Sequence, residues 1–214
     1  MNKIKEKVLV GFSGGVDSTS TIDTLRKKGF QPVAVFLKMS EGGDLEKVRQ
    51  MADKLRVGLV VKDISNIFSD CIIKGFLEEY RNNRTPNPCV KCNYEIKFKF
   101  LLKIADELGI EKVATGHYAR IEKRGEEYVL LKGEDEQKDQ SYFLYRLTQK
   151  ELARTVFPLG EEKKEAIKKR ALEKGWFEKI EESQDICFLD KEQKVQNFLQ
   201  EKLDDRKEIF EGVI

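Results

Sequence analysis

Four short apolar runs alternate with helix-like stretches along the first 117 residues, and this order constrains the fold more than any other feature. The runs are KVLVGF (7–12), PVAVFLK (32–38), VGLVVKDI (57–64) and EKVATGH (111–117). Each run is short and almost continuously apolar, which predicts a strand buried on both faces. The stretches between them predict helices over 17–29, 44–55 and about 67–82, with a further helix after residue 92. This alternation predicts an α/β fold, a Rossmann-like parallel sheet with helices on both faces.

The pattern changes after the fourth run. Residues 118–133 alternate around Arg124 and Gly125, which predicts a β-hairpin. Beyond it we expect helices over 139–147, 148–156, 161–174 and 191–203, and a last short strand in SQDICFL (183–189). The expected organisation is therefore a main domain over residues 1–138, which carries a cysteine loop and the hairpin, and a small, mostly helical C-terminal subdomain over residues 139–214.

The composition excludes several classes of protein. Of the 214 residues, 40% are hydrophobic and 36% charged, which is typical of a soluble globular chain rather than a disordered one. No apolar run approaches the length of a membrane span, and the N-terminus lacks the apolar segment of a signal peptide, so we expect a cytoplasmic protein without a membrane partner. Four cysteines in such a chain favour metal binding or thiol chemistry over a disulfide framework.

The stretch VGFSGGVDS joins the first predicted strand to the first predicted helix. Gly14 and Gly15 allow the backbone to approach an anion, and the helix N-terminus supplies free N–H groups. Ser13 and Ser18 can donate hydrogen bonds to phosphate oxygens, and Asp17 can hold Mg²⁺. A glycine turn that merely closes a strand–helix unit is the alternative. The position of this stretch between a strand and a helix, together with its complete S-G-G-x-D-S motif, favours a nucleotide-binding site.

The stretch RTPNPCVKCNYEIKF (84–98) places two cysteines three residues apart in a basic loop. Its two prolines predict an extended backbone, with Cys89 and Cys92 just before a helix N-terminus. A helix N-terminus and nearby positive charge lower the pKa of a thiol, so we expect thiolates here. A zinc half-site or a redox pair are alternatives, but His117 is the only histidine in the sequence. Cys71 falls on an apolar helical stripe, which predicts a core residue.

The S-G-G-x-D-S spelling resembles the PP-loop ATP pyrophosphatases, which cleave ATP to AMP and pyrophosphate and adenylate an oxygen that is then displaced. Five further stretches have the order and spacing of the tRNA-specific 2-thiouridylases: RTPNPCVKCNYEIKF, ATGHYAR, KDQSYFLYRLTQ, FPLGEEKKEAIKKRA and SQDICFL. In that family, ATP activates O2 of the wobble uridine in tRNA, and sulfur replaces the adenylated oxygen at C2. The resemblance implies a PP-loop nucleotide-binding domain over residues 1–138, with ATP, Mg²⁺ and tRNA as expected ligands.

The resemblance also implies the roles of individual residues. Cys92 and Cys187 match the two family cysteines. Residues expected to bind ATP are Gly11, Ser13, Gly14, Gly15, Val16, Asp17, Ser18, Phe36, Leu37, Gly116 and His117. Residues expected to contact the RNA substrate are Arg84, Asn87, Lys97, Gln140, Ser141 and Asp185.

The chain departs from the family pattern at Cys89, where many members have Asp. Three thiolates, from Cys89, Cys92 and Cys187, suit a four-iron, four-sulfur cluster whose fourth iron holds sulfide. A persulfide relay through Cys92 and Cys187 alone, and a zinc site, remain alternatives. We also expect a short form without the two β-rich domains that usually follow, a homodimer as one assembly, and free sulfide or a sulfur carrier as donor. Rival functions are a PP-loop sulfur transferase for a small molecule or another tRNA position, and a non-catalytic iron–sulfur or sulfur carrier.

Overall fold

The computed structural model describes residues 5–40, 45–180, 186–189 and 195–202. At its centre lies a five-stranded sheet in the order β3-β2-β1-β4-β7, in which every pairing is parallel. Its strands are β1 (Lys7–Gly11), β2 (Gln31–Lys38), β3 (Leu59–Asp63), β4 (Lys112–Ala114) and β7 (Thr155–Val156). This arrangement confirms the predicted Rossmann-like α/β fold.

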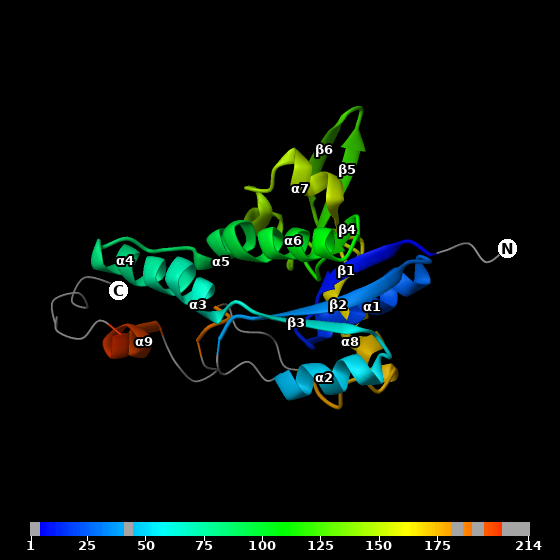
Figure 1. Ribbon diagram of the computed structural model, residues 1–214, viewed down its shortest axis with the longest axis horizontal. Helices are drawn as coiled ribbons and strands as arrows, with labels where there is room; N and C mark the ends of the chain where they lie inside the picture. The colour runs from blue at the N-terminus through cyan, green and yellow to red at the C-terminus, as the bar shows by residue number, and fades with distance from the viewer. Residues whose placement is uncertain (1–4, 41–44, 181–185, 190–194, 203–214) are drawn as a thin grey trace.

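The helices follow the strands along the chain (Figure 1). They are α1 (Val16–Lys27), α2 (Leu45–Lys54), α3 (Ser65–Phe68), η1 (Ser69–Ile73), α4 (Lys74–Arg81), α5 (Pro88–Cys92), η2 (Asn93–Phe98), α6 (Lys99–Glu107), η3 (Ser141–Leu144), α7 (Gln149–Arg154), α8 (Lys164–Glu173) and α9 (Val195–Lys202). The segments η1 and η2 are π-helical and η3 is a 3₁₀ turn. The long helix expected near residues 67–82 is present as the continuous run α3-η1-α4.

The central strand β1 shows why the sheet is buried on both faces. Val8, Leu9 and Val10 are fully buried, and β1 pairs with β2 on one side and β4 on the other. Successive side chains of a strand point to opposite faces. Val8 and Val10 accordingly pack with residues of α1 and α2, whereas Leu9 packs with residues of α3, η1, η2 and α6. Helices therefore cover both faces of the sheet, with α1 and α2 on one side and α6 on the other (Figure 1).

The predicted hairpin is also present. Strands β5 (Ala119–Arg124) and β6 (Glu127–Lys132) pair antiparallel, and Arg124 pairs with Glu127 across the turn. Gly125 has a φ of +62°, a conformation that few side chains tolerate. The hairpin projects away from the main sheet (Figure 1).

The segment after residue 139 differs from the prediction in three places. The helix expected over 148–156 ends at Arg154, because Thr155 and Val156 form β7 beside β4. The helix expected over 139–147 is only the 3₁₀ turn η3. Residues 186–189 form a turn rather than a strand, and the rest of SQDICFL lies outside the described residues. The domain boundary at residue 139 stays a prediction, although β7 joins the main sheet.

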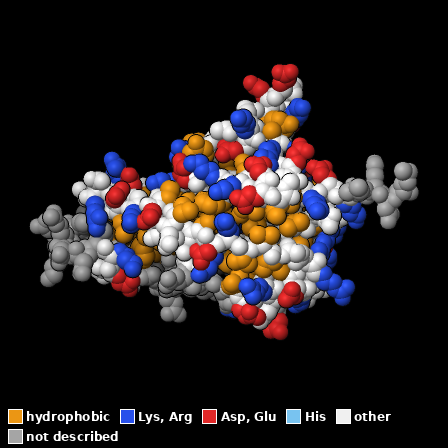
Figure 2. All heavy atoms as spheres, in the orientation of Figure 1, with side chains coloured by type: hydrophobic (Ala, Val, Ile, Leu, Met, Phe, Trp, Pro, Cys, Tyr) orange, Lys and Arg blue, Asp and Glu red, His pale blue; other side chains and the backbone are white. Residues whose placement is uncertain are grey.

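One edge of the sheet faces solvent. Figure 2 shows hydrophobic side chains over the middle of the molecule, around the edge strand β3 and between α6 and α2. Val61 on β3 is 37% exposed, and Leu108 after α6 is 45% exposed. The homodimer stays a prediction, because exposed hydrophobic side chains do not identify the surface that would cover them.

Within the part of the chain that the structure describes, no helix is both long enough and apolar enough to cross a membrane.

Candidate active site

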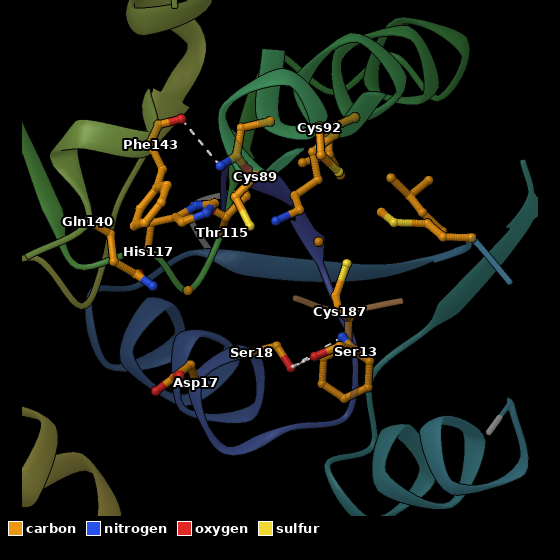
Figure 3. A pocket seen from close by; sticks show the side chains of 18 of the residues that line it. Ser13, Asp17, Ser18, Cys89, Cys92, Thr115, His117, Gln140, Phe143 and Cys187 are labelled. Atoms are coloured by element: carbon orange, nitrogen blue, oxygen red, sulfur yellow. Dashed lines mark hydrogen bonds between the residues drawn. The ribbon is translucent and has the colours of Figure 1, made fainter. Parts of the chain in front are cut away.

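A cavity of about 650 Å³ lies where the carboxyl ends of the parallel strands meet the helices (Figure 3). Gly11 ends β1, Leu37 lies near the end of β2 and Thr115 follows β4, and all three line the cavity. Its other walls come from α5, η2, η3 and residues 186–188. Ligands of open parallel sheets bind at this edge, so the cavity is the candidate site.

The S-G-G-x-D-S stretch forms the floor of the cavity between β1 and α1. Gly14 has a φ of +75°, which accounts for the glycine at this position. Ser18 Oγ donates to the Gly15 carbonyl at 3.1 Å and lies 3.3 Å from Ser13 Oγ, so the two hydroxyls share one small network. Gly15 is the N-cap of α1 and offers no capping side chain. The first N–H groups of α1 therefore remain available to an anion. Residues 13–18, which we call the phosphate loop, fit a bound phosphate.

Asp17, in the first turn of α1, is held by two neighbours. Lys164 Nζ lies 2.6 Å from both carboxylate oxygens, and the Tyr118 hydroxyl donates to Oδ1 at 2.9 Å. Burial and the adjacent Asp17 carboxylate raise the pKa of the Tyr118 phenol, which keeps it a donor. The Asp17 carboxylate is of the type that Mg²⁺ prefers, but a metal ion there would compete with the Lys164 ammonium.

Gly116 and His117 directly follow β4, and both line the cavity. A Cβ atom on Gly116 would lie 3.0 Å from the Cβ of Asp17, so only glycine allows this close approach to α1. The His117 Nδ1 lies 2.6 Å from Thr115 Oγ1, and its ring stacks near Phe98 at 6.2 Å. Burial, with a smaller effect of Lys97, holds the pKa of His117 well below its usual value. His117 is therefore a neutral wall residue.

Three cysteines line the same cavity. Cys89 is half-buried, Cys92 is buried and Cys187 is exposed. The side chains of Cys89 and Cys187 enter the cavity from opposite sides (Figure 3). Cys71 instead packs against the main hydrophobic core, as its helical stripe predicts.

The surroundings of the cysteine pair correct two expectations. Cys89 and Cys92 lie inside α5 rather than in a loop before a helix, because Pro88 occupies the first turn and Asn87 caps it, accepting from Val90 N at 3.3 Å. The expected low pKa is also wrong for Cys92. Burial raises the pKa of this thiol to about 11, and the positive charge of Lys97 offsets the effect only in part.

The cysteines fit an iron–sulfur cluster in type and number but not in their present spacing. Among the described residues, no group of three or more His, Cys, Asp or Glu side chains is placed to hold a metal ion.

The expected RNA-binding residues separate into two groups. Lys97 and Gln140 line the cavity. Arg84 instead pairs with Glu79 on the surface, with N–O distances of 2.7 and 3.0 Å. Asn87 serves as the cap of α5, and the Ser141 hydroxyl donates to Asp139 at 2.8 Å. Asp185 lies outside the described residues.

Lys164 and Asn93 are among the polar residues of the cavity that the sequence analysis does not select. Lys164 comes from the start of α8, far from the phosphate loop in sequence, and Asn93 directly follows Cys92. The FPLGEEKKEAIKKRA stretch contains Lys164, but nothing in its spacing separates this lysine from its charged neighbours. The one signal for Asn93 in the sequence is its position directly after Cys92.

The fold and its phosphate loop at the carboxyl edge of the sheet define an α/β protein of the Rossmann-like HUP class. Residues 6–191 match the family described as the tRNA methyl transferase HUP domain, and the chain belongs to this family.

Two similar curated proteins are both named tRNA-specific 2-thiouridylases. The chain is 42% identical over 191 residues to the tRNA-specific 2-thiouridylase MnmA 3 of Bacteroides fragilis, covering 88% of this chain and 52% of that protein. It is 44% identical over 186 residues to the tRNA-specific 2-thiouridylase MnmA of Syntrophomonas wolfei, covering 86% and 55%. The chain thus spans about half the length of these curated relatives.

A solved structure supports the fold alone. It is described as a predicted subunit of tRNA methyltransferase from Methanocaldococcus jannaschii, and it matches with a TM-score of 0.52 and 18% identity over 78% of this chain and 76% of that one.

Proposed function

We propose that the protein is an ATP-dependent sulfur transferase that adenylates the O2 atom of a uridine in tRNA and replaces it with sulfur. The observation that carries this proposal is that the phosphate loop and three cysteines line one cavity. Two chemistries that the reaction must combine, activation of an oxygen and delivery of sulfur, thus share one site. Similarity to the tRNA-specific 2-thiouridylases supports tRNA as the substrate.

In the first half-reaction, the uridine O2 attacks the α-phosphorus of ATP, and pyrophosphate leaves. The N–H groups at the start of α1 and the hydroxyls of Ser13 and Ser18 bind and orient the phosphates. Asp17 would hold Mg²⁺, which supplies positive charge to the phosphates when it is bound with ATP. Lys164 also lines the cavity and would be free to contact the phosphates if the metal took its place at Asp17.

In the second half-reaction, hydrosulfide attacks C2, AMP leaves with the former uridine oxygen, and the sulfur gives up its proton as C2=S forms. Exposed Cys187 is the cysteine that a sulfur donor can reach, whereas Cys92 lies in the buried wall. In the finer form of the proposal, Cys89, Cys92 and Cys187 would hold a four-iron, four-sulfur cluster after moving closer together than they lie in this structure.

The phosphate-loop assignment predicts release of pyrophosphate. With ATP, Mg²⁺ and a uridine-containing tRNA, the wild-type protein should release pyrophosphate and AMP. Asp17→Asn should slow this release by about 10²-fold, because it removes the carboxylate that would hold Mg²⁺ at the phosphates. Pyrophosphate release is measured by a coupled assay.

The matched control is Asp53→Asn, the same chemical change at an exposed position of α2. It should leave the rate unchanged. Release of ADP and phosphate, or equal rates for Asp17→Asn and the wild type, would contradict the assignment. Pyrophosphate release that depends on the RNA also separates an enzyme from a carrier protein.

The cluster predicts a distinct outcome for Cys89→Asp. Protein reconstituted without oxygen should contain about four irons per chain and absorb broadly in the visible range. Cys89→Asp should lose most of this iron together with thiolation, while Cys71→Ala should keep both. Iron content and thionucleosides are measured by elemental and mass analysis. An active, iron-free Cys89→Asp protein would favour the persulfide relay instead.

A further inference from the structure

Asn93 is a buried polar residue of the cavity that the proposed chemistry leaves unused. It is the first residue of η2, only 3% exposed, and it lines the cavity directly after Cys92. Its Nδ2 donates to the Phe143 carbonyl of η3 at 3.3 Å, the dashed line at Phe143 in Figure 3. Its Oδ1 is buried and has no hydrogen-bond partner among the described residues.

The contact with Phe143 fixes which way the amide faces. A backbone carbonyl only accepts hydrogen bonds, so the NH₂ group of Asn93 must face it. The flipped amide would set two acceptor oxygens against each other. The free Oδ1 atom of this cavity-lining residue is therefore an acceptor, and it calls for an N–H or O–H donor.

A buried acceptor without a partner destabilises a folded protein, since it has lost its hydrogen bonds to water. Such an atom in a cavity is most readily explained by a ligand that satisfies it. Gln140 offers the complementary group, because its Oε1 accepts from Tyr118 N at 3.1 Å, which leaves its NH₂ as a donor.

We propose that Asn93 is a specificity-determining residue whose Oδ1 accepts the N3–H of a uracil base in this cavity. This inference rests on the proposed function and names how the substrate base is selected. Uracil carries one ring donor, N3–H, between two carbonyl oxygens, which matches the acceptor of Asn93 and the donor of Gln140 in the same cavity. Cytosine has an unprotonated N3, so it would place a lone pair against Asn93 Oδ1 and leave both acceptors unpaired.

The test compares RNA stem–loops with uridine, N3-methyluridine or cytidine at the acceptor position. Affinity is measured by competition without ATP, and pyrophosphate release is measured with ATP. The wild type should favour uridine over each analogue by roughly 10- to 100-fold in affinity, the range for loss of a specific base contact. Asn93→Ala should weaken uridine binding by a similar factor and leave the analogues nearly unchanged, so that discrimination disappears.

Asn93→Gln is the second variant, because it keeps both an NH₂ donor for the Phe143 carbonyl and an acceptor oxygen. It should retain discrimination against cytidine even where overall affinity falls. If Asn93→Ala weakens all three RNAs equally, Asn93 only supports Phe143 and the inference is overturned. Loss of discrimination in Asn93→Gln to the level of Asn93→Ala also overturns it.

The two readouts separate this inference from the proposed function. Selective uridine binding that depends on Asn93, without pyrophosphate release, supports the inference and contradicts the function. If pyrophosphate is released but selectivity for uridine does not depend on Asn93, the proposed function is supported and the inference is contradicted. Absence of uridine preference in the wild type overturns the inference outright.

Discussion

Cys92 in the folded protein should react with iodoacetamide about 100-fold more slowly at pH 8 than the same cysteine in urea. Its pKa is raised from 9.0 to about 11, mainly by burial, and a shift of two units lowers the thiolate fraction about 100-fold. The rate should then rise about tenfold per pH unit up to pH 10. Mass spectrometry of peptides after timed alkylation measures it, with exposed Cys187 in the same molecule as the control.

The same shift predicts a change in stability with pH. The folded pKa of Cys92 lies above its unfolded value, so the stabilisation is complete below pH 9 and is lost as the pH rises towards 11. The loss should be of the order of 3 kcal/mol. Alkylation of Cys92 at pH 7 as fast as that of Cys187, or a flat stability between pH 9 and 11, would contradict a buried, neutral thiol.

Gly160→Ala should destabilise the protein by about 3 kcal/mol or more, because overpacking against rigid backbone cannot be relieved by a side-chain rotation. A Cβ atom at this position would lie 1.9 Å from the carbonyl oxygen and 2.7 Å from the carbonyl carbon of Ala119, which is fully buried. The segment is also fixed by a hydrogen bond from Glu134 N to the Gly160 carbonyl at 2.8 Å. Urea or thermal denaturation measures the change.

Gly58→Ala is the matched control for this substitution. Nothing lies within 4 Å of a Cβ atom there, so the change should alter stability by less than about 1 kcal/mol. A Gly160→Ala protein that unfolds together with the wild type would show that Ala119 and Gly160 are not in contact in solution.

The strands around β1 could be predicted because their cause is local to the sequence. Val8, Leu9 and Val10 are consecutive apolar residues, and a run without alternation is what burial on both faces requires. The hairpin had an equally local signal in Arg124 and Gly125. Strand β7 had none, because its two residues become a strand only through pairing with β4, which lies some forty residues earlier.

The sequence predicts part of the residue set that lines the cavity, and predicts less of their chemistry. The phosphate loop and the cysteines carry recognisable spacings, and the structure brings the loop and Cys89, Cys92 and Cys187 to one cavity. The charge around Cys92 was visible in the sequence, but its burial is set by tertiary packing, and burial dominates its pKa. Lys164 was missed for the same reason, because its contact with Asp17 spans distant segments.

The π-helical segment η2 determines which side chains of this part of the chain face the cavity. Cys92 and Lys97 are five residues apart, and in a regular α-helix, at 100° per residue, they would point about 140° apart. The wider turn of a π-helix, with its i to i+5 repeat, brings such residues close to one face, and both line the cavity. Deleting one residue from η2 would restore α-helical winding and rotate one end of the helix against the other by about 100°. The ammonium that partly offsets the burial of Cys92 would then leave the wall, so this local insertion, rather than the amino-acid types alone, couples the lysine to the thiol.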